Sequence, residues 1–150
     1  MSLKIILEVI PHEKQRLNEQ GDWWWDGDTL QVRASELGDW RYNFLLLAHE
    51  MDEAVFCRYN HITTTMVDQD QIWASQHPEI ENNPDSFSGY PGSCLQVQHN
   101  DALALEWIRS RILGVNWQDY GDAYSAYEPK LEKPKTMQEF MNEEADEANN

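Results

Sequence analysis

Apolar residues follow two different periods along the chain, and the change between them predicts the order of strands and helices. Residues 4–10 (KIILEVI) are apolar at alternate and at neighbouring positions, which is typical of a strand buried on both faces. Asp26-Gly27 is a type I′ turn dipeptide with apolar residues on both sides. Residues 23–25 and 29–33 are therefore expected to form a hairpin, which gives a small N-terminal sheet of three strands.

Beyond residue 39 the apolar period lengthens to that of a helix. Trp40, Phe44, Leu47 and Met51 share one helical face, and Asp39 precedes them as a candidate N-cap, so a helix is predicted over residues 40–58. Further helices are expected within residues 61–77, 100–113 and 114–127. The expected fold is α+β, with the sheet followed by three to four helices.

Changes in composition set the expected domain limits. Residues 1–127 are predicted to form a single α+β domain, and residues 128–150 an acidic, partly disordered tail. Residues 77–93 are rich in Pro, Gly, Asn and Ser and are predicted to form a long loop. Loops of that length in a compact domain are usually mobile or functional.

Charge and hydropathy narrow the classes of partner. The formal net charge of −16 argues against nucleic acid and against an anionic membrane surface, because both require Lys and Arg to neutralise phosphates. The N-terminus lacks the features of a secretory signal, and no apolar stretch approaches the roughly 18 residues of a membrane-spanning helix. A cytoplasmic protein is expected, whose partner is an unidentified protein or peptide. Cys57 and Cys94 are expected to be free thiols.

The predicted helix over 40–58 contains the motif HExxE, with His49, Glu50 and Glu53. His49 and Glu53 lie one helical turn apart on one face and can both bind one divalent metal ion. Glu50 then stands where the general base stands in HExxH enzymes. Zinc is favoured, and the carboxylate ligand also admits manganese or iron.

Three residues elsewhere are candidates for a further metal ligand: His99, Asp68 and Glu106. Each also has an ordinary structural interpretation. His99 can cap the helix that follows it, and Asp68, beside Asp70, can favour a helix N-terminus through the helix dipole. Glu106 can pair with a neighbouring arginine on the surface.

Two further features allow a structural and a functional interpretation. Cys57 lies one turn beyond Glu53 and is more typical of a small buried hydrophobic residue than of a thiolate ligand. The run from Trp23 to Trp25 is either a binding platform or, as we favour, a strand whose tryptophans pack on both faces.

A wider pattern is carried, in order, by the segments IPHEKQR, GDWWW, ASELGDWR, AHEMDEAVFCR, MVDQD, QHNDALALE and GVNWQDY. It resembles a group of small uncharacterised bacterial and phage-borne proteins with the pattern HExxExxxC, VD, H and GVxW, over about residues 10–120. That group is similar to a reduced zincin-like metallopeptidase fold, with Glu53 in place of the second histidine of HExxH peptidases. The resemblance implies the cytoplasm of a bacterium or of a phage-infected host cell. It also implies a site formed by His49, Glu50, Glu53, Cys57, Asp68 and His99.

Three functions follow from these observations as hypotheses. The first is a metal-dependent hydrolase of peptides or other amides, with Glu50 as the base. The second is a non-catalytic binding protein of phage or prophage origin on a zincin-like scaffold. The third is a helical nucleotide pyrophosphohydrolase in which Glu50 and Glu53 bind magnesium, and the predicted N-terminal strands argue against it.

Overall fold

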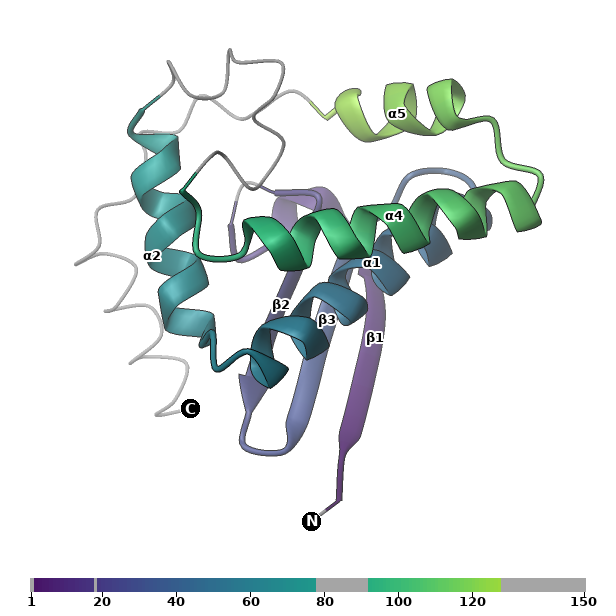
Figure 1. Ribbon diagram of the computed structural model, residues 1–150. Coiled ribbons are helices and arrows are strands. Elements are labelled where there is room, and N and C mark those ends of the chain that lie inside the picture. The colour runs from purple at the N-terminus through teal and green to yellow at the C-terminus, as the bar shows by residue number, and fades with distance from the viewer. Residues whose placement is uncertain (1, 18, 78–91, 128–150) are drawn as a thin grey trace.

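The computed structural model describes residues 2–17, 19–77 and 92–127. These residues form a three-stranded sheet followed by four helices, which confirms the predicted α+β order (Figure 1). The strands are β1 (Lys4–Ile10), β2 (Gly21–Asp26) and β3 (Thr29–Ser35), with a short 3-10 turn, η1 (His12–Lys14), after β1. The helices are α1 (Trp40–Tyr59), α2 (Thr64–Ser75), α4 (Gln96–Ile112) and α5 (Trp117–Ser125).

The sheet has the strand order β1-β3-β2, with β1 parallel and β2 antiparallel to β3. Gly27 has a φ of 57°, the left-handed conformation that a type I′ hairpin turn requires. The predicted hairpin is therefore confirmed, and both of its strands extend beyond the predicted limits.

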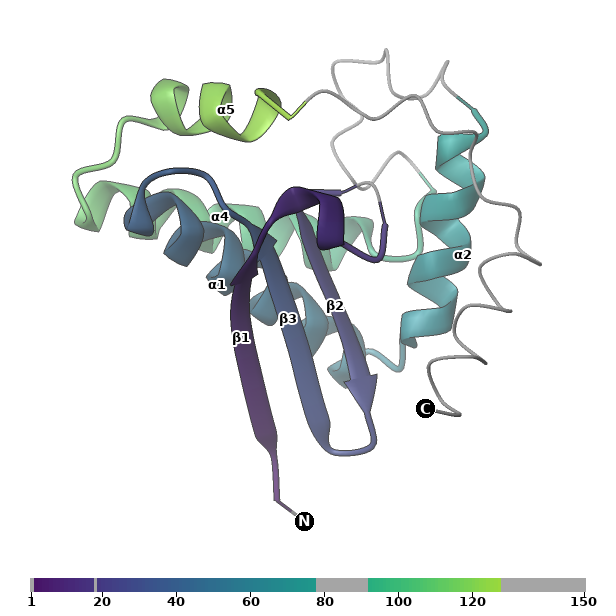
Figure 2. The ribbon, with the colours of Figure 1, turned by 180° about the vertical axis from the view of Figure 1, so that it is seen from behind.

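Helix α1 lies across one face of the sheet, and α4 lies along α1 on the side away from the sheet (Figure 1, Figure 2). Side chains alternate between the two faces of a strand, so Trp23, Leu30 and Val32 point toward α1. There they are buried together with Ala54 and Cys57 of the helix. This packing holds α1 between the sheet and α4.

The tryptophans of β2 pack on both faces of the strand, as favoured from the sequence. Trp23 is buried beneath α1. Trp24 points to the opposite face, where the guanidinium groups of Arg16 and Arg33 lie 4.9 and 4.8 Å from its ring centroid. Over Trp25 the guanidinium of Arg58 lies 3.9 Å from the centroid.

Two predictions about the elements are wrong. Strand β1 is not buried but lies at the edge of the sheet, where Ile5, Leu7 and Val9 are 39, 47 and 41% exposed. Helix α4 begins at Gln96, before the predicted residue 100, and no side chain among the described residues caps it. The buried side chain of Leu95, packed in the core, anchors this helix start instead.

Some predictions fall outside the described residues: most of the loop predicted at 77–93 and the whole of the tail at 128–150. Within the part of the chain that the structure describes, no helix is both long enough and apolar enough to cross a membrane.

Candidate metal centre

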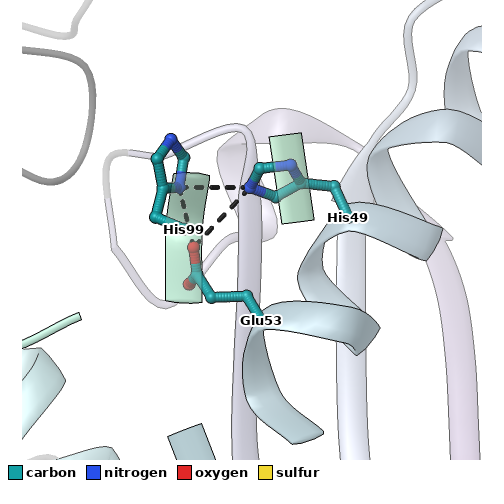
Figure 3. Close-up of side chains that lie close together, drawn as sticks. All are labelled: His49, Glu53 and His99. Atoms are coloured by element: carbon teal, nitrogen blue, oxygen red, sulfur yellow. Dashed lines mark hydrogen bonds and ion pairs between the residues drawn. The ribbon is translucent and has the colours of Figure 1, made fainter. Parts of the chain in front are cut away.

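Three side chains from two helices meet in the interior of the domain. His49 and Glu53 stand one turn apart on α1, and His99 comes from the first turn of α4 (Figure 3). His49 Nε2 lies 3.2 Å from His99 Nδ1 and 3.6 Å from Glu53 Oε2, and the latter two atoms are 2.8 Å apart. His49 is only 5% exposed, His99 6% and Glu53 4%. This buried group could hold a metal ion.

Two of the three separations are close to those that a small tetrahedral ion needs. Ligands at roughly 2.0–2.2 Å from such an ion lie about 3.3–3.6 Å from one another. Two edges of the triangle are at or near this range, and a small outward movement of Glu53 would widen its 2.8 Å edge to His99. Two imidazoles and one carboxylate are also a donor set of catalytic zinc sites.

Neighbouring side chains fix the orientation of both α1 residues. His49 Nδ1 lies 2.8 Å from Glu106 Oε2, while the Tyr120 hydroxyl donates to the other oxygen of Glu106. Trp23 Nε1 donates to Glu53 Oε1 at 2.8 Å. When Nδ1 of His49 carries the proton, its Nε2 lone pair and Glu53 Oε2 both face the centre. A histidine held by a carboxylate in this way is typical of metal sites.

Hydrogen bonds and ion pairs shift the pKa values of His49 and Glu53 in opposite directions. Burial lowers the pKa of His49, but the hydrogen bonds to Glu106 and Glu53 outweigh burial and raise the pKa well above its ordinary value. Burial raises the pKa of Glu53, but the bonds from His49 and His99 outweigh it and lower that pKa. Without a metal ion, the centre therefore holds Glu53 as a carboxylate and His49 as an imidazolium. A metal cation would replace the proton on His49 Nε2 and would face the same carboxylates.

One side-chain nitrogen of the centre, in His99, has no hydrogen-bond partner within the described part of the chain. His99 Nε2 is buried and lacks a partner among the described residues, whereas Nδ1 of the same ring faces Glu53 and His49. Buried polar atoms of native proteins nearly always have partners. The orphaned nitrogen therefore indicates that His99 is placed for its Nδ1 contacts rather than for satisfaction of its whole ring.

Glu50, the predicted general base, lies against the start of β2. A Cβ atom on Gly21 would be 2.1 Å from Glu50 Oε1 and 2.5 Å from its Cδ, so the carboxyl group occupies space that only glycine leaves free. Its pKa is raised well above the ordinary value by burial and by the neighbouring Glu53 carboxylate.

The other predicted ligands are placed elsewhere or act differently. Asp68 is not a member of the group, and its Oδ1 lies 3.4 Å from Arg16 Nη2. Glu106 accepts a hydrogen bond from His49 instead of pointing into the triangle. Cys57 is buried in the apolar core, where burial raises the pKa of its thiol to about 12. This packing confirms the core interpretation of Cys57.

Sequence reasoning missed Trp23 and Tyr120. Strand alternation could have indicated that Trp23 points toward the helix that carries Glu53. No local signal connects Tyr120 with Glu106, because their contact depends on how α5 folds back toward α4.

Comparison with protein families, with curated proteins and with solved structures finds no match for this chain. The zincin-like resemblance remains a prediction. The chemistry assigned to the centre therefore rests on the geometry of His49, Glu53 and His99 themselves.

We predict that His49→Ala and His99→Ala each abolish metal uptake, because each removes one of three converging ligands. His77→Ala is the matched control, since His77 stacks on Trp73 and is outside the group. Elemental analysis of protein purified without a metal-affinity tag measures the bound metal, and circular dichroism checks the fold. If both variants bind metal like the parent, the ligand set is wrong.

Trp23→Phe tests the support of Glu53. Phenylalanine keeps an aromatic ring in the core but removes the N–H that donates to Glu53 Oε1. We expect a loss of roughly 1–3 kcal/mol in the free energy of unfolding, because a buried acceptor loses its donor. Metal affinity should fall by roughly 10–100-fold, the usual effect of losing a partner of a metal ligand. Unchanged metal affinity in a calorimetric titration would show that Trp23 only fills the core.

Proposed function

We propose that this protein is a metal-dependent hydrolase of amide bonds, with His49, Glu53 and His99 as the metal ligands and Glu50 as the general base. The observation that carries the proposal is the buried triangle of ligand atoms, two of whose separations are close to those of a tetrahedral ion's ligands. The hydrogen bond from His49 to Glu106 supports it, because this bond directs the His49 Nε2 lone pair inward.

Zinc is the proposed metal. Two imidazoles and a carboxylate suit zinc, and three protein ligands leave a fourth position for water or substrate. The carboxylate is a harder ligand than a third imidazole, so manganese and iron are the alternatives. When bound, such an ion lowers the pKa of water and polarises a carbonyl oxygen.

Each residue of the centre has a defined part in this chemistry. In its carboxylate form, which a neighbouring metal cation would favour, Glu50 would take a proton from the attacking water and pass it to the leaving amine, as a general base and then a general acid. Trp23 holds one oxygen of Glu53, which leaves the other oxygen for the metal. Glu106, held by Tyr120, keeps His49 in the required orientation.

A peptide is the proposed substrate class, with other amides as alternatives. The net charge of −16 disfavours polyanionic substrates. The zincin-like resemblance also supports a peptide, since it implies a scaffold related to metallopeptidases.

One observation favours a second candidate, a non-catalytic binding protein on the same scaffold. All three ligands are nearly inaccessible, and His49 already has carboxylate partners on both of its nitrogens without any metal. A metal centre closed to substrate would explain both the burial of the ligands and the two carboxylate partners of His49. A buried polar cluster without a metal ion would explain them equally well. This candidate predicts that Glu50 can be replaced without functional loss.

Glu50→Gln and Gly21→Ala separate the two candidates. Glu50→Gln removes the base and should lower the rate of amide hydrolysis by roughly 10²–10⁴-fold while metal content stays at the parent level. Gly21→Ala should act in the same direction, because its Cβ would displace the Glu50 carboxyl group without altering a ligand. Rates are measured on a panel of fluorogenic peptides with zinc-loaded protein.

The expected pattern is hydrolysis by the parent, loss in both variants and equal metal content in all three. Gly121→Ala serves as the control, since a Cβ there meets nothing. Hydrolysis that survives in Glu50→Gln would exclude Glu50 as the base. A metal-loaded parent that cleaves no peptide in the panel would favour the binding protein.

A further inference from the structure

Strand β1 leaves one edge of the sheet open. It is the terminal strand in the order β1-β3-β2, and among the described elements no strand lies beside its outer edge in either view (Figure 1, Figure 2). The unpaired N–H and C=O groups of an edge strand are a template for another strand, and proteins usually shield them with charge, bulges or covering elements.

Backbone direction shows which residues face the open edge. Lys4 N–H donates to Asp28 O, and Ile10 O accepts from Glu36 N–H, so the backbone groups of even-numbered residues point toward β3. Those of the alternate residues, Leu3, Ile5, Leu7 and Val9, therefore point outward, and they can pair with another strand.

The side chains of the same outward-bonding residues form an apolar surface. Paired residues of neighbouring strands share a face, so Ile5, Leu7 and Val9 lie on the α1 side of the sheet with their partners Leu30, Val32 and Ala34. The β3 residues are fully covered, whereas the β1 residues are 39–47% exposed. A strand whose sequence predicts burial is thus left partly exposed by the described residues.

Helix α1, which contacts β1, carries two further exposed apolar side chains. Phe44 and Val55 are 46 and 39% exposed, and they lie on one side of the helix because eleven residues are close to three full turns. Leu47 and Met51, near the same side, pack against the core beneath α1. Helix α1 contacts β1 as well as β2 and β3.

We propose that a second copy of this chain pairs with β1 in antiparallel orientation, which joins the two sheets into one of six strands. The twofold axis passes through Ile6, so that Ile5 lies opposite Leu7 of the partner subunit and Lys4 lies opposite Glu8 of the partner subunit. Both α1 helices then lie on the same face of the joined sheet. The apolar β1 side chains of the two copies become neighbours beneath them.

The charges of Lys4 and Glu8 favour this register, and they favour a second copy of the chain as the partner of β1. Outward-bonding residues must lie opposite one another, so the register changes in steps of two residues. The neighbouring registers place Lys4 opposite Ile6 or Ile10 of the partner subunit. Only the register centred on Ile6 places Lys4 opposite the partner's Glu8 twice, once on each side of the axis. The strand is thus complementary to itself in charge, as a twofold interface requires.

Charge variants test the interface independently of the metal centre. Lys4→Glu places a carboxylate opposite the partner's Glu8, and Glu8→Lys places an ammonium group opposite the partner's Lys4. Each variant should raise the dissociation constant of the dimer by roughly tenfold, because like charges directly opposite destabilise a strand pair. Lys14→Glu makes the same change in net charge as Lys4→Glu, on an exposed residue outside β1, and should leave the dimer unchanged.

Mixing the two charge variants gives the decisive result. In a heterodimer, each of the two cross-strand pairs again joins a glutamate of the Lys4→Glu subunit to a lysine of the Glu8→Lys subunit. An equimolar mixture should therefore recover the affinity of the parent, measured by sedimentation equilibrium. The intrachain contact of Glu8 with Arg33 is lost in Glu8→Lys whether or not that variant is mixed, so it does not explain recovery. A mixture no tighter than the single variants would overturn the proposed register.

The parent alone can also overturn the proposal. It should sediment as a dimer that dissociates on dilution. A parent that is monomeric at every concentration contradicts pairing through β1. The same conclusion holds if the monomer floats with phosphatidylcholine vesicles, because a lipid surface would then cover the strand instead of a second copy. A dimer of unchanged affinity in Lys4→Glu would place the interface elsewhere.

Discussion

The buried hydrogen bond between His49 Nδ1 and Glu106 Oε2 is the contact on which the candidate centre depends. It joins α1 to α4 in the interior, where ionised groups are stable only when they are paired and hydrogen-bonded. The same bond orients the His49 ring toward Glu53 and toward His99, which belongs to the same helix as Glu106. The packing of α1 against α4 therefore also determines the geometry of the centre.

Tyr120 and Trp23 extend this network in opposite directions. Tyr120 connects Glu106 to α5, and Trp23 connects Glu53 to the sheet. The sheet, α1, α4 and α5 thus each contribute a side chain to this network. Apart from His99 Nε2, the polar atoms named in this network are hydrogen-bonded, which favours this arrangement over any that would leave further buried polar groups without a partner.

Local patterns in the sequence predicted the parts of the centre that one element carries. The helical period and the HExxE motif placed His49, Glu50 and Glu53 correctly on one helix, and the scarcity of histidine indicated His99. The same patterns did not separate His99 from Asp68, since the choice depends on which helix packs against α1. They also predicted burial for β1, because an apolar strand in the middle of a sheet and one at an unpaired edge have the same sequence pattern. Tertiary contacts decide these cases.

Anomalous diffraction at the zinc absorption edge, from crystals of protein purified without a metal-affinity tag, tests the central claim most directly. A single strong peak within bonding distance of His49 Nε2, Glu53 Oε2 and His99 Nδ1 is the predicted result. A map with no peak there, in crystals where His49 keeps its hydrogen bond to Glu106 and its ion pair with Glu53, would contradict the claim and identify the cluster as a polar core without a metal ion.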